Sequence, residues 1–130
     1  MITTALQETF PQEKDVEVIF LGEWCRTLNA KNVWQRFNSK VMPYHWDDRE
    51  KLYCDYQEIL ELYENILIDL SIELNKIHGV QYDTRYWRIL VGPWLADFIQ
   101  IVLDRYMMLR SAFKEHQSYE LLAIAREKFS

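Results

Sequence analysis

Glycine and proline are scarce in this sequence, with three of each among 130 residues. Tight turns depend on these two residues, so the chain has little material for the many turns of an all-β fold. Cysteine is scarce as well: Cys25 and Cys54 are the two present, and their separation fits neither a disulfide framework nor a metal-binding motif. We therefore expect a helix-rich protein with two reduced thiols.

The sequence also lacks a net positive charge and long apolar runs. The formal net charge is −5 and no cluster of Lys or Arg stands out, which argues against a nucleic-acid-binding surface. No apolar run approaches the ~20 residues that a transmembrane helix needs, and residues 1–15 lack the pattern of a signal peptide. These absences predict a cytoplasmic protein without a transmembrane segment.

Familiar catalytic motifs are missing too. The sequence contains no Walker loop and no GxGxxG, CxxC, HExxH or GxSxG motif. Nucleophilic, zinc and dinucleotide chemistry therefore have no positive support from the sequence. We expect this segment to hold no metal and no cofactor of its own.

Apolar residues make up 49% of the sequence and aromatic residues 15%, enough to bury the core of one domain over residues 1–130. Residues 16–21, VEVIFL, predict a strand covered on both faces, as in an α/β sheet. Residues 2–6 could form a short strand or an extended arm. The spacing of Val33, Trp34 and Phe37 indicates a short helix near 30–38.

A long helix over residues 47–77 is the clearest expectation. Apolar residues recur there at steps of three and four, in a stripe wider than a coiled-coil seam. Asp47 is the expected N-cap, with Glu50 three residues further on as in a capping box. His78 and Gly79 supply the carboxyl-terminal stop.

A second helical region is predicted from 84 to 115. Gly92 and Pro93 interrupt it, because proline removes a backbone donor and clashes with the preceding turn, so two helices or one sharp kink are expected. Beyond this point the helix is apolar around most of its circumference, which predicts burial by more than one neighbour. For residues 118–130 a terminal helix is favoured over a strand.

The predicted fold is therefore mostly helical in this segment, with one or two strands and two long antiparallel helices joined at 79–83. One strand cannot form a sheet alone, and an isolated hairpin would be marginally stable. We expect the apolar helix faces to pack against a missing carboxyl-terminal domain or another chain.

Glu23, Trp24 and Arg26 follow the predicted strand at 16–21. In open α/β sheets, ligands bind beyond the carboxyl ends of the strands. Glu23 is therefore the candidate catalytic residue, as a general base or as the acceptor of a substrate hydroxyl, and Trp24 and Arg26 are candidate substrate contacts. The alternative is a local ion pair between Glu23 and Arg26, with Trp24 covering the core.

His45, Trp46, Asp47 and Asp48 crowd the start of the long helix. Paired carboxylates can hold a divalent cation, and a helix N-terminus can receive a phosphate, but the two uses conflict because the carboxylates would repel an anion. The simpler interpretation, which the pattern favours, is that Asp47 caps the helix, Asp48 complements its dipole, and His45 and Trp46 pack as a staple. His45, Asp47 and Asp48 remain candidate substrate contacts.

Arg85 and Arg88 are three residues apart and share one helix face. Together they could clamp a phosphate or a carboxylate of a substrate. The alternative is a set of ion pairs with acidic residues, namely Asp47, Asp48 or Asp83. The neighbouring Trp87 and Trp94 are more typical of core residues, because burying an indole is strongly stabilising.

Several blocks recur in an order that is similar to a known family: ETF, FLGEWCR, PYHWDDREKLY, TRYWRILVGPWL and DRY. Over residues 3–110 the chain resembles the amino-terminal part of a family of transferases encoded with O-antigen and other surface-polysaccharide genes, including those of leptospires. Residues 112–130 depart from that pattern.

The resemblance implies an α/β, GT-B-like sugar transferase with two Rossmann-like halves, of which residues 1–130 would be the amino-terminal domain or a fragment that is inactive alone. It further implies a nucleotide-activated donor for the full-length enzyme, a carbohydrate acceptor, and a cytoplasmic location that could include the periphery of the inner membrane. The resemblance assigns no catalytic residues, so the candidates above rest on chemistry alone. The competing interpretation is a non-enzymatic helical module for protein interaction.

Overall fold

The computed structural model describes residues 1–13, 15–116, 120 and 121, and these fall into two compact units. Unit 1 comprises Met1–Tyr44 together with the residues from Met108 onward, and unit 2 comprises His45–Met107. The terminal helix expected at 118–130 lies outside the described residues, apart from two positions that are not helical.

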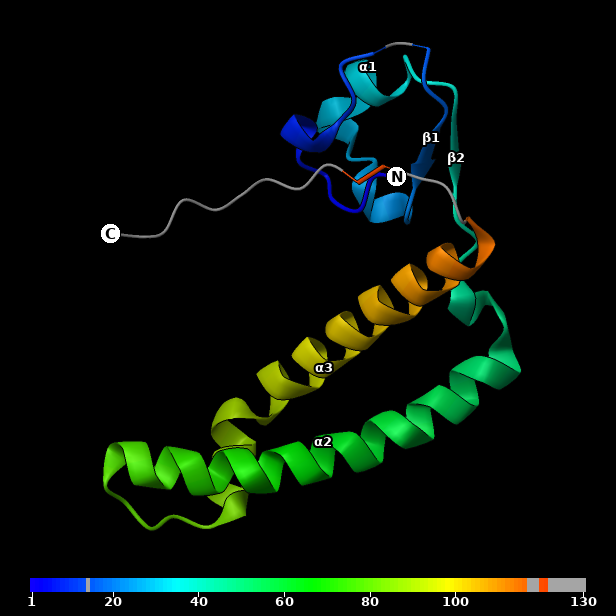
Figure 1. The fold of residues 1–130 in the computed structure, drawn as a ribbon. Helices are drawn as coiled ribbons and strands as arrows, with labels where there is room; N and C mark the ends of the chain where they lie inside the picture. The colour runs from blue at the N-terminus through cyan, green and yellow to red at the C-terminus, as the bar shows by residue number, and fades with distance from the viewer. Residues whose placement is uncertain (14, 117–119, 122–130) are drawn as a thin grey trace. The chain divides into compact units, whose positions relative to one another are not determined.

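A small parallel sheet forms the centre of unit 1 (Figure 1). Strand β1 (Val18–Phe20) pairs with strand β2 (Ser39–Val41), with Val18 opposite Ser39 and Phe20 opposite Val41. On the other side of β1, Ile2 forms a single parallel bridge with Phe20. The strand predicted at 16–21 is therefore confirmed, although it is shorter, and the segment at 2–6 contributes one bridge.

Short helical segments connect the two strands of unit 1. After a 3₁₀ helix η1 (Gln7–Thr9) and β1, the chain forms η2 (Glu23–Cys25), η3 (Leu28–Ala30) and a one-turn helix α1 (Lys31–Trp34). The helix expected near 30–38 is thus present but covers only its first part. Side chains from these segments and the sheet share one core, completed by the end of α3: Ile2, Phe10, Val18, Phe20, Leu21, Cys25, Met42, Met108 and Ala112.

Unit 2 begins with η4 (His45–Asp47) and continues into helix α2 (Arg49–His78). The N-cap of α2 is Asp48, whose Oδ1 accepts hydrogen bonds from the backbone N–H groups of Glu50 (3.0 Å) and Lys51 (3.1 Å). The assignment of the cap to Asp47 was wrong by one residue, because Asp47 still belongs to η4 while Asp48 has the extended backbone that an N-cap needs. Gly79 ends the helix with a left-handed φ of 64°, as predicted.

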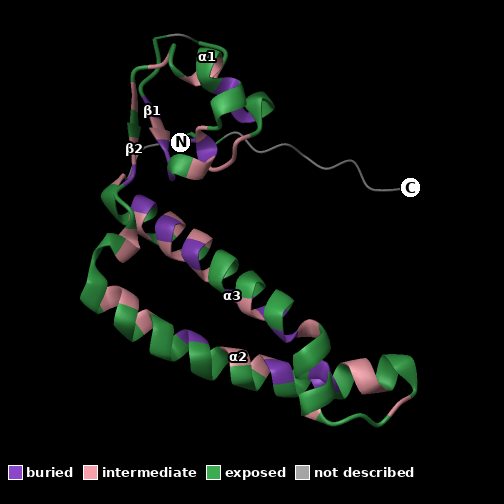
Figure 2. Cartoon of the chain, turned by 180° about the vertical axis from the view of Figure 1, so that it is seen from behind, coloured by how far each residue is buried: buried purple, intermediate pink, exposed green. Residues whose placement is uncertain are grey.

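Helix α3 (Thr84–Glu115) runs back beside α2, and the two pack through Ile59 and Leu67 of α2 and Leu95 and Ile99 of α3. Figure 2 shows that both helices carry buried residues among many exposed ones. The expected fold class is confirmed: the described chain is mostly helical, with two short parallel strands and two long packed helices.

Gly92 and Pro93 lie inside a continuous α3, so the chain forms one helix here instead of two. The ribbon of α3 changes direction near this point (Figure 1), which fits the kink expected from a proline. A Cβ on Gly92 would lie 2.6 Å from the hydroxyl oxygen of Tyr63, so glycine allows α2 and α3 to approach closely.

One face of α3 is not covered in unit 2. We call Leu90, Trp94, Phe98 and Ile101 the α3 apolar stripe, since they follow steps of four, four and three residues. They are 57%, 58%, 50% and 57% exposed, and the rings of Trp94 and Phe98 stack at 5.1 Å. The described residues of unit 2 leave the stripe uncovered, so burial of this helix by a further neighbour, in a missing domain or another chain, stays a prediction.

Candidate functional site

Glu23 and Arg26 lie just beyond the carboxyl end of β1, in and after η2. Arg26 Nη1 is 3.6 Å from Glu23 Oε1, so the local ion pair expected from the sequence is present. The Glu23 side chain is nevertheless 76% exposed, whereas that of Arg26 is 27% exposed. The carboxylate is thus oriented by an arginine and remains accessible to a ligand.

Trp24 has the covering role that was the alternative to substrate stacking. Its ring packs against the core of unit 1, and its Nε1 donates a hydrogen bond to the Thr3 carbonyl at 3.3 Å. A Cβ on Gly22 would lie 1.9 Å from the indole, so the ring can occupy this place only because residue 22 is glycine. Trp24 therefore fixes the position of η2 on the core.

Arg26 lies between the ion pair and an aromatic ring. Its guanidinium carbon is 4.4 Å from the centroid of the Trp34 ring, and Trp34 Nε1 donates to the Thr27 carbonyl at 2.9 Å. The Nε of Arg26 is buried and has no hydrogen-bond partner among the described residues. Trp34 was not singled out as a site residue, because its separation of eight positions from Arg26 follows no local periodicity.

His45 and Asp104 form a buried polar pair in unit 2. His45 Nε2 is 2.9 Å from Asp104 Oδ1, and the two side chains are only 5% and 11% exposed. Arg105 forms an ion pair with the other oxygen of Asp104. His45 is therefore held inside the unit, and Asp104, which was not a predicted site residue, is its partner.

Trp46 and Asp55 form a second polar contact beside this pair. Trp46 Nε1 donates to Asp55 Oδ2 at 2.9 Å, and Lys51 forms an ion pair with the same oxygen from one helical turn away. Burial acts to raise the pKa of the Asp55 carboxyl, but the hydrogen bonds from Lys51 and Trp46 outweigh it, so the pKa lies below its ordinary value of 3.8. The Asp55 carboxyl group therefore stays negatively charged at neutral pH.

The other acidic residues of this segment have simpler roles. Asp48 is the N-cap of α2, and Asp47 is exposed at the end of η4. No group of three or more His, Cys, Asp or Glu side chains is arranged to hold a metal ion in the part of the chain that the structure describes. Neither Cys25, which is buried, nor Cys54, which is exposed, forms a disulfide in the part of the chain that the structure describes.

Arg88 pairs with Glu64 of α2 through two hydrogen bonds of 2.6 and 2.7 Å. The expected partners Asp47, Asp48 and Asp83 were therefore wrong for this arginine. The hydrogen bonds from Arg88 lower the pKa of the Glu64 carboxyl below its ordinary value of 4.5. Arg85 is exposed and takes no part in this pair, and the use of the two arginines as a clamp for a ligand stays a prediction.

The two tryptophans near this pair differ in burial. Trp87 is buried and its Nε1 donates to Asn75 Oδ1 at 2.9 Å, as expected for a core residue. Trp94 belongs to the exposed α3 apolar stripe, so the expectation that it lies in the core was wrong. The helix period places both rings on similar faces, but Trp87 lies against Asn75 of α2, whereas the ring of Trp94 remains exposed.

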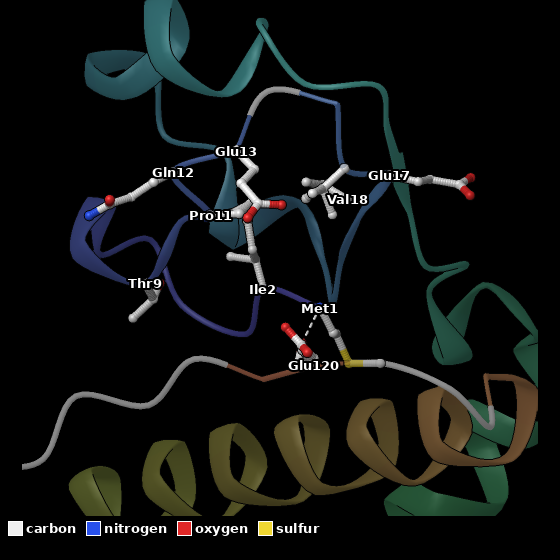
Figure 3. A pocket seen from close by; sticks show the side chains of 10 residues that line it. Met1, Ile2, Thr9, Pro11, Gln12, Glu13, Glu17, Val18 and Glu120 are labelled. Carbon is white, nitrogen blue, oxygen red and sulfur yellow. Dashed lines mark hydrogen bonds between the residues drawn. The ribbon is translucent and has the colours of Figure 1, made fainter.

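A pocket of about 360 Å³ lies at the amino end of β1, at the opposite end of this strand from Glu23 (Figure 3). Met1, Ile2, Glu13 and Val18 are among its lining residues, and the Met1 amino group donates to the Glu120 carbonyl at 2.8 Å. Figure 3 shows Glu17 pointing away from the other lining side chains, toward the side where it pairs with Lys40 at 2.8 Å.

Comparison with known protein families identifies the class. A family model for a transferase matches almost the whole chain, over residues 1–129. The chain belongs to the LIC12162 family of transferases. The match extends beyond residues 3–110, where the resemblance was found, into the segment after Ala112. No curated protein and no solved structure matches the chain.

None of the helices in the described residues combines the length and the apolar character that crossing a bilayer requires.

Proposed function

We propose that the chain acts in the transfer of a sugar from a nucleotide-activated donor to the hydroxyl of a carbohydrate acceptor during surface-polysaccharide or O-antigen biosynthesis. Membership of a transferase family supports the reaction class. The resemblance to transferases encoded with surface-polysaccharide genes supports the pathway. In this proposal residues 1–130 form the acceptor side, and the donor is bound mainly by a carboxyl-terminal domain or by another chain.

The observation that carries this proposal is the exposed Glu23 carboxylate beyond the carboxyl end of a parallel strand. Ligands of parallel sheets bind at this edge. Transfer to a hydroxyl needs a group that accepts the proton as the oxygen attacks, and a carboxylate at hydrogen-bonding distance can do so. Glu23 is thus the proposed general base.

Arg26 is the proposed positioning residue for this carboxylate. Its guanidinium is fixed over the Trp34 ring and is close enough to Glu23 to orient it. The remaining N–H donors of Arg26 can bind an acceptor oxygen. Trp24 supports the site indirectly by fixing η2 on the core.

Replacing the gene with one encoding Glu23→Gln tests the role of this residue in the intact cellular system. If Glu23 is the general base, the yield of surface polysaccharide and the rate of nucleoside diphosphate release from nucleotide sugars should fall by at least ~10²-fold. Glu8→Gln is the matched control, because it makes the same change at an exposed position of η1. Equal activity of the two variants would remove the proposed role from Glu23.

A second candidate function is a non-enzymatic helical module that pairs with another copy of the chain. The α3 apolar stripe favours it, because exposed apolar patches of this kind mark interaction surfaces. Two identical stripes can pair around a two-fold axis, which is the commonest arrangement of homo-oligomers.

Analytical ultracentrifugation of the full chain tests this second function by measuring whether the chain forms a dimer. A dimer that dissociates in the double variant Trp94→Ser, Phe98→Ser would support it. A chain that stays monomeric over the whole accessible concentration range would remove that support, and it would leave the transferase proposal unaffected.

A further inference from the structure

A second cavity, of about 260 Å³, lies entirely within unit 2, between η4, α2 and α3. Its polar lining residues are Trp46 from η4 and Asp55 and Glu58 from α2. Its apolar lining consists of Ile59 and Leu62 of α2 and Leu103 and Met107 of α3. The α2 residues are spaced by three, one and three positions, so they share one helix face.

Asp55 and Trp46, on the polar side of this cavity, are fixed in place before any ligand enters. Asp55 is oriented by its hydrogen bond from Trp46 and its ion pair with Lys51, and its side chain is only 15% exposed. The Trp46 ring in turn contacts the His45 ring in a tilted arrangement, with 4.5 Å between centroids, and His45 is held by Asp104. An oriented carboxylate in such a setting is a strong acceptor for hydroxyl or ammonium groups.

The size and charge of the cavity limit what can bind. At about 260 Å³ it lies below the roughly 300–1,000 Å³ of sites for drug-sized ligands, so it suits a single ring and not a complete nucleotide sugar. Two carboxylates in the lining disfavour a phosphate or another anion. The aliphatic and indole walls favour a ligand with an apolar face.

We propose that this cavity binds one neutral sugar ring of the acceptor, whose hydroxyl groups donate to Asp55 and Glu58 while its C–H face packs on Trp46, Leu103 and Met107. The choice of a sugar among hydroxyl-bearing ligands rests on the proposed function. The evidence for the cavity is the geometry of unit 2 and does not depend on that function.

Saturation-transfer NMR on the full chain tests this assignment with glucose, galactose, mannose and N-acetylglucosamine as probes. At least one of these sugars should receive saturation on its ring C–H protons. Glu58→Gln and Asp55→Asn should each weaken its binding by about tenfold, the loss expected for one hydrogen bond to a charged acceptor. Glu61→Gln is the matched control, because this residue is exposed on the same helix and does not line the cavity.

Three outcomes would overturn the proposal. The first is the absence of saturation transfer to all four sugars, and the second is binding that is unchanged in both Glu58→Gln and Asp55→Asn. The third is binding of glucosamine, which carries an ammonium group, without binding of any neutral sugar, since this would indicate a cation site. Because Glu58 is exposed, Glu58→Gln keeps the test valid even if Asp55→Asn disturbs folding.

The catalytic role of Glu23 and the sugar site in unit 2 can be contradicted by different results. Sugar binding should be unchanged in Glu23→Gln if that residue acts only in the chemical step, whereas Asp55→Asn should raise the KM for the acceptor and leave kcat largely intact. Loss of sugar binding with a retained effect of Glu23→Gln would remove the cavity alone. Sugar binding without any effect of Glu23→Gln would remove the catalytic role alone.

Discussion

His45 and Asp104 are 59 residues apart in the sequence, yet His45 Nε2 and Asp104 Oδ1 are joined at 2.9 Å inside unit 2. Both side chains are nearly inaccessible to solvent, and Arg105 neutralises the second oxygen of the carboxylate. A buried carboxylate is stable only when its oxygens are paired in this way. The pair therefore attaches η4 to α3, and through the neighbouring Trp46 it also fixes Asp55 in the cavity of unit 2.

Asp104→Asn should destabilise the protein by about 1–3 kcal/mol, because His45 and Arg105 would then contact a neutral amide instead of a buried carboxylate. The free energy of unfolding in urea, followed by tryptophan fluorescence, measures this loss. Asp97→Asn makes the same change at an exposed position of α3 and should stay within about 0.5 kcal/mol of the wild type. Equal stability of the two variants would show that the His45–Asp104 contact does not stabilise the fold.

Asp48→Ala should cost about 1 kcal/mol of stability, because it leaves two backbone N–H groups of the first turn of α2 without their acceptor. Asp47→Ala should cost only a few tenths of a kcal/mol, since this exposed residue can contribute only through the helix dipole. Urea unfolding of the two variants compares neighbouring residues of identical chemistry. A larger loss of stability for Asp47→Ala than for Asp48→Ala would indicate that Asp47 is the N-cap of α2.

The long helices could be predicted from the sequence because their signals are local. Apolar spacing, an acidic residue at the start and Gly79 at the end all lie within α2 itself. The one-residue error at the cap arose because Asp47 and Asp48 are chemically identical, and only the extent of η4 decides between them. Strand β2 was missed because its three residues include the polar Ser39 and Lys40, and it exists only through pairing with β1.

The candidate site could be predicted only in part, for a related reason. Glu23, Arg26 and His45 stand out locally, but their setting depends on residues distant in the sequence. Asp104 is brought to His45 by the return of α3, and Glu64, 24 residues before Arg88, is brought to that arginine by the packing of the two helices. A single sequence gives no information on such long-range pairs. Asp104 and Glu64 could therefore not be predicted as the partners of His45 and Arg88.

The Glu64–Arg88 pair should make stability depend on pH in the acid range. The pKa of Glu64 is lower in the folded chain than its ordinary value of 4.5, so the stabilisation is complete above that pH. It is lost as the pH falls below 4.5 through the lower, folded-state pKa. Since both groups are exposed, added salt should weaken the effect.

Carboxyl ¹³C shifts of Glu64 measured against pH test this directly. In Arg88→Gln the pKa of Glu64 should return toward 4.5, whereas Arg85→Gln, an equivalent change at an exposed position of the same helix, should leave it low. A Glu64 pKa that is insensitive to Arg88→Gln would contradict the bidentate pair.

Gly22→Ala should destabilise unit 1 by about 1–3 kcal/mol, because the added methyl group would lie within 1.9 Å of the Trp24 ring and must displace it. Displacing Trp24 also removes its hydrogen bond to Thr3 and loosens η2, which carries Glu23. Near-ultraviolet circular dichroism should therefore change together with the free energy of unfolding.

A double-mutant cycle separates this contact from a general effect of the substitution on the backbone. Gly22 has an extended φ of −172°, which alanine can also adopt, so Gly22→Ala should cost little once the indole is removed by Trp24→Leu. We expect a coupling of about 1–3 kcal/mol between the two positions. Additive effects would mean that Trp24 does not lie over Gly22, and the orientation of Glu23 at the sheet edge would then lack its structural support.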